Sequence, residues 1–151
     1  MWVAPAIMHL DSAAAMASCP GVQTVYTFAN ASGLAGVDCG TNVCSGEPST
    51  TGAVSLGAMT GMASHTTLTV TGSVAVAVQP PSNPPNRDMI LVLLDGVIID
   101  CIDGINSSNS IALNTVVSDH SSCTGTLSLL GCVTNTATET WSYSGITVTL
   151  S

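Results

Sequence analysis

Lysine is absent from this chain of 151 residues, and Arg87 is the only strong base against nine carboxylates, which gives a formal net charge of -8. Nucleic-acid binding draws most of its affinity from lysine and arginine side chains that neutralise phosphates, so a single arginine excludes it. The same shortage excludes lysine Schiff bases, P-loops, lysine–asparagine isopeptide cross-links and polybasic docking to membranes.

Aromatic residues make up 3% of the chain and charged residues 7%, whereas charged residues usually reach about 25%. The 46% of hydrophobic residues must therefore build a core from valine, isoleucine, leucine and alanine, a composition that favours pleated sheet. So few aromatic rings also make a sugar-stacking cleft hard to build. We expect an uncharged, polar surface.

Long apolar runs are missing as well. No stretch reaches the ~18 apolar residues of a membrane helix, so we expect no membrane insertion. The first 17 residues lack the basic start of a signal peptide, and we interpret them as part of the mature chain.

Side chains alternate between polar and apolar from Thr67 to Val78, which predicts a half-buried strand that bends or bulges at Gly72. A short hairpin turning at Thr71-Gly72 is the alternative. The following stretch 79–86 contains four prolines and predicts a stiff, extended loop.

A hairpin is predicted where Met89–Leu94 meets Asp95-Gly96 and continues as Val97–Ile99. Both faces of these two strands are apolar. Such strands lie in the middle of a sheet that is covered on each side, or at an interface with another subunit.

Further strands are predicted at Ile111–Val117, Thr126–Leu130 and Trp141–Leu150, with weaker ones at Val22–Phe28 and Ala53–Met62. In Trp141–Leu150 the apolar face changes sides near Gly145, where we expect a bulge. A single helical turn is predicted at Ser12–Ala17.

These patterns predict an all-β protein, a disulfide-stapled β-sandwich of seven to nine strands that is either Ig-like or a jelly-roll. The length suits one domain. We assign residues 1–18 to an N-terminal extension that is a candidate donor strand, and residues 19–151 to a single β-sandwich domain.

Six cysteines at spacings that match no C-x-x-C site predict three disulfides and an extracellular or cell-surface location. Six cysteines allow fifteen connectivities. Proximity in sequence favours Cys39 with Cys44 across a short loop and Cys123 with Cys132 across a hairpin, which leaves Cys19 with Cys101. Buried free thiols are the alternative.

Sequons at Asn30 and Asn106, and the rarer cysteine variant at Asn42, are candidate glycosylation sites. Covalent glycans are therefore expected partners of the chain. A chain this rich in asparagine, serine and threonine also produces such triplets by chance.

The densest polar group is Asp95, Asp100, Asp103 and Asn106, whose oxygens are a weak candidate for calcium. The group does not match the twelve-residue calcium loop, and its Asp-Gly pairs are also turn formers, so we expect no metal and no cofactor. Asp119-His120-Ser121-Ser122 contains the residue types of a hydrolase, but adjacent side chains do not form a relay. No nucleophile elbow is present, and we expect no enzymatic activity.

The apolar start of the chain, Met1–Leu10, is a candidate subunit interface. It packs on its own domain as an edge strand, or it inserts into a groove of a neighbouring copy by strand addition. The second plan resembles surface filaments and pili built by donor-strand complementation. The side chains assigned to the contact are Trp2, Val3, Ile7, Met8 and Leu10.

We therefore predict a non-enzymatic structural subunit of an extracellular homopolymeric filament, with copies of itself as partners. Scarce charge lets subunits pack without desolvating ions. One alternative is a monomeric extracellular adhesin or carbohydrate-binding module that uses the Asp95–Asn106 loops. A second alternative is a viral coat or surface-layer protein.

Overall fold

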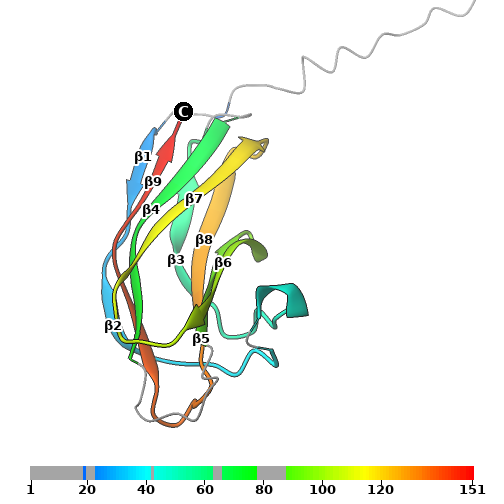
Figure 1. The fold of residues 1–151 in the computed structure, drawn as a ribbon. Helices are drawn as coiled ribbons and strands as arrows, with labels where there is room; N and C mark the ends of the chain where they lie inside the picture. Colours follow the sequence, from blue (N-terminus) through cyan, green and yellow to red (C-terminus); the bar gives the residue numbers. More distant parts are fainter. Residues whose placement is uncertain (1–18, 20–22, 42, 63–65, 78–87) are drawn as a thin grey trace, which may run out of the picture.

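The computed structural model describes residues 19, 23–41, 43–62, 66–77 and 88–151. They form two antiparallel sheets and no α-helix (Figure 1). The sandwich is all-β, as the sequence predicts. Its nine strands are β1 Val25–Thr27, β2 Ala31–Ala35, β3 Val54–Thr60, β4 Thr66–Ala77, β5 Asp88–Leu94, β6 Val97–Ile105, β7 Ile111–His120, β8 Thr124–Cys132 and β9 Thr140–Leu150, with the short 3-10 helix η1 at Cys44–Gly46.

The strand pairs are nested like a long hairpin that has been rolled up. β5 pairs with β6, β4 with β7, β3 with β8, and β1 and β2 both pair with β9. Contacts between β4 and β9 and between β5 and β8 join these pairs into sheet A, ordered β1-β9-β4-β7 with β2 also on β9, and sheet B, ordered β3-β8-β5-β6. This order is that of a jelly-roll, so of the two predicted sandwiches the jelly-roll is the observed one.

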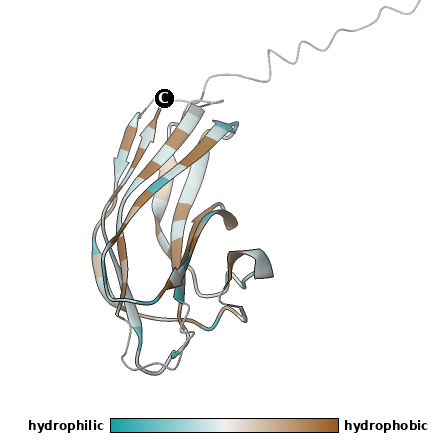
Figure 2. Cartoon of the chain, viewed as in Figure 1, coloured by the Kyte–Doolittle hydropathy of each residue, from teal (hydrophilic) through white to brown (hydrophobic). Residues whose placement is uncertain are grey.

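The core between the sheets comes from the alternation along each strand. Leu68, Val70, Val74 and Val76 of β4 point inward and are buried, while threonine, serine and alanine alternate with them on the outside. Figure 2 shows this change of hydropathy from residue to residue along the strands. β4 runs without interruption through Gly72, so the predicted long strand is confirmed and the hairpin alternative is wrong.

Gly72 faces a bulge in β9. The register between β4 and β9 shifts between Thr71 and Ser73, and Gly145 has a φ of +60°. The extra residue lets Trp141 and Tyr143 on one side of the bulge and Ile146 and later residues on the other all face the core. The bulge predicted near Gly145 is confirmed.

β5 is buried at every position because both of its faces are covered within the chain. Ile90, Val92 and Leu94 face the core between the sheets. Met89, Leu91 and Leu93 lie on the outer side of sheet B. Residues 36–41 and 43–53, here called the strap, contribute Val37, Cys39 and Ala53 against them. The double-sided apolar pattern of β5 is therefore explained without a second subunit. β6 does not lie in the middle of the sheet: it is an edge strand of sheet B, and its Val97 is 65% exposed.

All six cysteines are oxidised, as predicted, but the predicted pairs are wrong. The disulfides join Cys19 to Cys123, Cys39 to Cys132 and Cys44 to Cys101. Cys123 and Cys132 cannot pair, because the intervening residues form the extended strand β8 rather than a hairpin, and nine extended residues span roughly 27 Å. Cys39 and Cys44 instead attach the strap to two different strands, β8 and β6.

Three disulfides indicate an oxidising, extracellular setting. Within the described part of the chain, no helix has the length and hydrophobicity needed to span a membrane. Three predicted features lie outside the described residues: the apolar extension at residues 1–18, the helical turn at Ser12–Ala17 and the proline-rich loop at 79–86.

Candidate functional site

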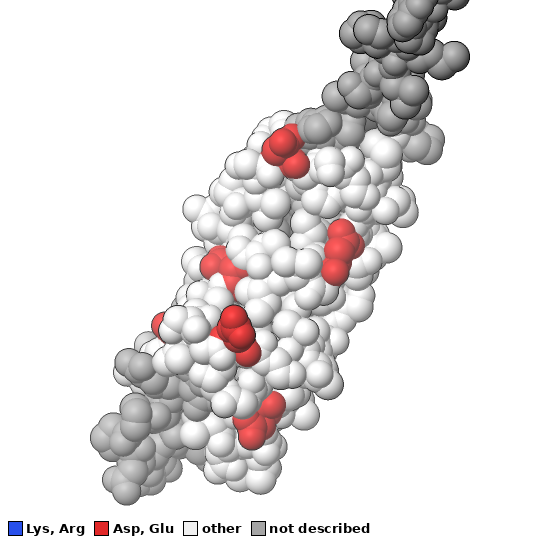
Figure 3. Space-filling view, turned by 90° about the vertical axis from the view of Figure 1, so that its right-hand side faces the viewer, with Lys and Arg blue, Asp and Glu red and all other residues white. Residues whose placement is uncertain are grey.

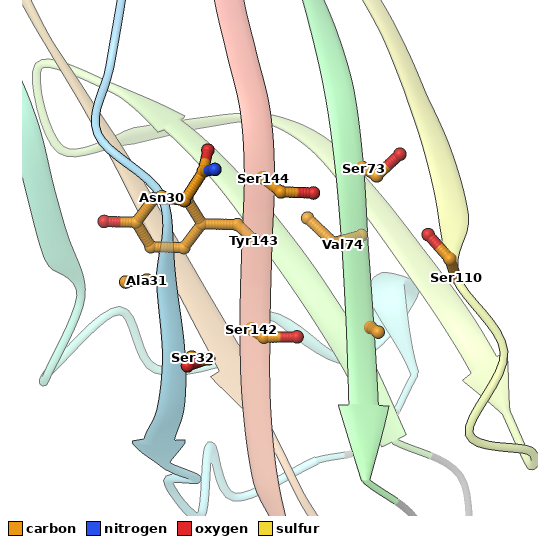
Figure 4. Close-up of a pocket in the computed structure, with 10 residues that line it drawn as sticks. Asn30, Ala31, Ser32, Ser73, Val74, Ser110, Ser142, Tyr143 and Ser144 are labelled. Atoms are coloured by element: carbon orange, nitrogen blue, oxygen red, sulfur yellow. The ribbon is translucent and has the colours of Figure 1, made fainter.

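A shallow cleft opens on the outer face of sheet A, with a volume of about 260 Å³ (Figure 4). We call it the serine cleft. It is lined by residues of β2, β4 and β9 and by the residues that precede β2 and β7: Asn30, Ala31, Ser32, Ser73, Val74, Ala75, Ser110, Ser142, Tyr143 and Ser144. The lining contains no lysine, arginine, histidine, aspartate or glutamate.

The strand alternation of β9 places the central hydroxyls. Trp141 and Tyr143 are buried, so the intervening Ser142 and Ser144 point outward. The register with β4 sets Ser73 opposite Ser144 and Ala75 opposite Ser142. Figure 4 shows the Ser142 and Ser144 side chains directed toward β4 and the Tyr143 ring directed toward β2.

Asn30 ties one rim of the cleft to the β9 bulge. Its Oδ1 accepts a hydrogen bond of 2.8 Å from the backbone N–H of Gly145. The carboxamide nitrogen keeps its two donors for a ligand or water. The bulge thus bends the sheet and at the same time fixes the orientation of a polar rim residue.

The cleft offers hydroxyls that are available for a ligand. Within the described part of the chain, no residue hydrogen-bonds to the five serine hydroxyls of Ser32, Ser73, Ser110, Ser142 and Ser144. Each hydroxyl provides one donor and two acceptor positions. A neutral, hydroxyl-rich ligand can therefore replace water as the hydrogen-bond partner of these serines.

Aromatic stacking contributes little at this site. The rings of Trp141 and Tyr143 lie 5.8 Å apart, and both residues are buried on the core side of β9. The Trp141 Nε1–H donates to the carbonyl of Ala35 at 3.1 Å, which connects β9 with β2. Of the two, only Tyr143 lines the cleft, and neither ring forms a platform for a sugar ring.

The structure uses the three aspartates of the weak calcium candidate to fix neighbouring groups. Asp95 Oδ1 accepts from the Thr126 N–H, and Asp103 Oδ2 accepts from the Cys44 N–H. Asp100 accepts from the Thr115 hydroxyl and from the Cys101 N–H. Asn106 is exposed. In the portion of the chain that the structure describes, no group of three histidine, cysteine or acidic side chains is placed to hold a metal ion.

His120 belongs to the segment with hydrolase residue types. Its side chain lies near Asp95, which is distant in sequence. Its Nε2 is 3.8 Å from Asp95 Oδ2. Asp119 has a φ of +57° at the end of β7. His120 and Asp95 are not among the residues that line the serine cleft.

A pair of buried carboxyl groups lies where β5 begins and β8 is connected to β9. Asp88 is 0% exposed, and its Oδ1 accepts from the backbone N–H and the hydroxyl of Thr134. Burial raises the pKa of Asp88; the Thr134 hydrogen bonds lower that pKa and the charge of Glu139 raises it. Glu139 is 1% exposed and accepts from the Asn135 N–H, so both acids hold the loop between β8 and β9.

Two of the three candidate glycosylation sites, Asn30 and Asn106, are exposed. Asn42 and the predicted interface residues Trp2, Val3, Ile7, Met8 and Leu10 lie outside the described residues.

The serine cleft is a site that the sequence does not reveal on its own. The alternation of serines with buried aromatics in β9 is a local signal that Ser142 and Ser144 point outward. Their juxtaposition with Asn30 and Ser73 depends on pairing between distant strands.

No family model matches the chain, and no curated protein matches it either. A solved structure that it resembles is the C-terminal domain of EclA, a sugar-binding protein, with 11% sequence identity, a TM-score of 0.49, and coverage of 98% of this chain and 89% of that one. We take the fold from the strand pairing of this chain alone.

Proposed function

We propose that this protein is an extracellular, non-enzymatic recognition domain that binds a neutral saccharide in the serine cleft. The observation that carries the proposal is the lining itself, which combines five serine hydroxyls and one carboxamide with small apolar side chains and no charge. Sugar hydroxyls are both donors and acceptors, and so are the serine hydroxyls that would meet them.

Charge limits the class of ligand. The chain has a formal net charge of -8 and one arginine in total. Uronic, sulfated or sialylated glycans carry negative charge that the cleft has no cation to balance, and the field of the molecule repels them. The ligand is therefore an uncharged sugar.

Size and chemistry limit the affinity. A volume of about 260 Å³ lies just below the ~300–1,000 Å³ of pockets that bind drug-sized molecules, which suits one sugar ring. Each neutral hydrogen bond contributes about 0.5–1.5 kcal/mol after exchange with water. With no stacked ring to add to this, we expect roughly millimolar dissociation constants for monosaccharides.

Titration of the full chain with neutral monosaccharides tests the proposal, with variants that change the cleft in two ways. Ser144→Ala removes a hydroxyl from the cleft, and its control, Ser118→Ala, removes an exposed hydroxyl on β7 outside it. We expect Ser144→Ala to weaken binding about fivefold and the control to bind like the parent chain.

Ala75→Leu fills the cleft without removing a hydrogen bond, and Ala58→Leu adds the same atoms to an exposed position on β3. We expect Ala75→Leu to abolish sugar binding and Ala58→Leu to leave it unchanged. Equal binding by both leucine variants would place the sugar elsewhere and overturn the assignment of the cleft.

The second candidate function is the filament subunit joined through apolar strands and N-terminal strand donation. Its support is the scarcity of charge together with two edge strands, since β3 and β6 end sheet B on either side among the described strands. Deleting Met1–Leu10 tests it, because strand donation requires loss of assembly with the β-sheet circular dichroism retained. Unchanged assembly would remove this mechanism.

A further inference from the structure

The outer face of sheet A has an uncharged area beyond the serine cleft. Of all described residues in the five strands of this sheet, Asp119 near the end of β7 is the only carboxylate. On the side of the molecule where β6 and η1 lie, in contrast, acidic side chains are spread over the surface (Figure 3). A chain with a net charge of -8 can approach another copy with least repulsion through the uncharged face.

Two rows of outward side chains cross the uncharged area, one residue from each of four strands. The first row runs Val25, Thr149, Thr69, Val116, and the second runs Thr27, Thr147, Thr71, Asn114. None of these eight side chains is buried. We call them the threonine face. Val25 and Val116 are 46% and 56% exposed, which is unusual for large apolar side chains in this structure.

The first row is symmetric across the sheet: valines occupy its two outer strands, β1 and β7, and threonines occupy its two inner strands, β9 and β4. We propose that the threonine face is the contact surface of a homodimer with a two-fold axis parallel to the strands, between β9 and β4. This operation places Val25 against Val116 of the second copy and Thr149 against Thr69 of the second copy. Valine then meets valine, and hydroxyl meets hydroxyl.

The available area predicts a weak dimer. Strands about 4.8 Å apart and outward residues about 6.8 Å apart give the whole outer face of sheet A roughly 650 Å². A stable complex buries about 800 Å² on each partner, and the threonine face is only part of the sheet. The contact closes at two copies, because each copy uses the same patch.

Sedimentation velocity of the full chain over a range of protein and salt concentrations tests the proposal. We expect reversible dimerisation that strengthens several-fold between about 0.01 M and 0.5 M salt, because salt screens the repulsion between two acidic molecules. A chain that stays monomeric at high protein concentration, or whose association weakens with salt, would overturn the proposal.

Matched variants locate the contact. Val116→Glu adds a charge to the threonine face, and Val97→Glu adds the same charge to a valine that is 65% exposed on β6. We expect Val116→Glu to weaken dimerisation about tenfold and Val97→Glu to leave it within about twofold of the parent chain. Equal effects of both variants would rule out the threonine face.

The double variant Val25→Lys/Val116→Glu tests the two-fold arrangement. In that arrangement Lys and Glu of opposite copies meet twice, so we expect dimerisation to return toward the parent value and to weaken with salt. Circular dichroism checks that each variant keeps its sheets. Failure of the lysine to restore a dimer lost in Val116→Glu would contradict the proposed symmetry.

Discussion

Cys39 and Cys132 are both almost fully buried, and their disulfide fastens the strap to the outer side of sheet B. The strap covers Met89, Leu91 and Leu93 of β5. The disulfide keeps the strap against these side chains and so shields them from solvent. A covalent bond between residues 93 positions apart therefore holds the cover of the apolar strand β5 in place.

Replacing both cysteines, Cys39→Ala/Cys132→Ala, is expected to lower the free energy of unfolding by about 2–4 kcal/mol. It should also increase the binding of a hydrophobic dye, since the part of the strap around Cys39 can then leave the outer side of β5, while the Cys44–Cys101 disulfide still attaches the strap to β6. The control is Cys19→Ala/Cys123→Ala, which removes a disulfide that does not fasten the strap. Equal dye binding by the two variants would mean that the strap stays in place without its disulfide.

Gly72→Ala is expected to destabilise the fold for two reasons. The φ of Gly72 is +146°, and an added Cβ would lie 2.5 Å from Ile146 Cδ1 and 2.9 Å from its Cα. The control is Gly33→Ala, where φ is +66° and no atom lies within 4 Å of the added Cβ. Urea denaturation should show a loss of roughly 1 kcal/mol for Gly33→Ala from backbone strain and at least twice that for Gly72→Ala. Equal losses would indicate that the bulge of β9 moves to accept the methyl group.

The pH dependence of stability should contain a contribution from Asp88. Its pKa in the folded protein is raised above the ordinary value of 3.8, so the protonated carboxyl favours the folded state. This contribution is complete below pH 3.8 and is lost as the pH rises through the folded pKa. Glu139, which is buried nearby, raises the same pKa through its charge.

Asp88→Asn keeps an acceptor for Thr134 and removes the titration, so its stability relative to the parent chain should rise with pH across that window. Chemical denaturation at a series of pH values measures this difference. Glu47→Gln removes an exposed charge and serves as the control. A constant difference between Asp88→Asn and the parent chain would contradict the raised pKa.

Asn30→Ala is expected to reduce both the stability of the bulge and the affinity for a neutral sugar. The carboxamide accepts from the Gly145 N–H at 2.8 Å and lines the serine cleft. Asn30→Asp keeps the acceptor and adds a negative charge, so stability should return while sugar binding changes. Thermal unfolding and titration of the two variants separate these roles, and equal unfolding of both would mean that the hydrogen bond contributes nothing.

Local patterns were sufficient to predict much of the fold. The alternation of β4, the Asp95-Gly96 turn and the change of face at Gly145 depend on neighbouring residues, and all three are confirmed. β2 was missed because Ala31–Ala35 contains no β-branched residue, and its pairing with β9 is what makes it a strand.

Long-range pairing explains what the sequence did not predict. Cys39 lies beside Cys132 because the strap packs on sheet B, so proximity in sequence predicted the wrong partner. The serine cleft likewise joins Asn30 to Gly145 across 115 residues. Neither relationship produces a local motif.

The central claim is that the serine cleft receives a neutral sugar. Backbone amide shifts of the isotope-labelled full chain, followed during titration with neutral monosaccharides, test it most directly. The account predicts saturable shifts at Asn30, Ser73, Ser142 and Ser144 and none at the Asp95–Asn106 loops. Shifts centred on those loops, or no saturable shift with any neutral sugar, would contradict it.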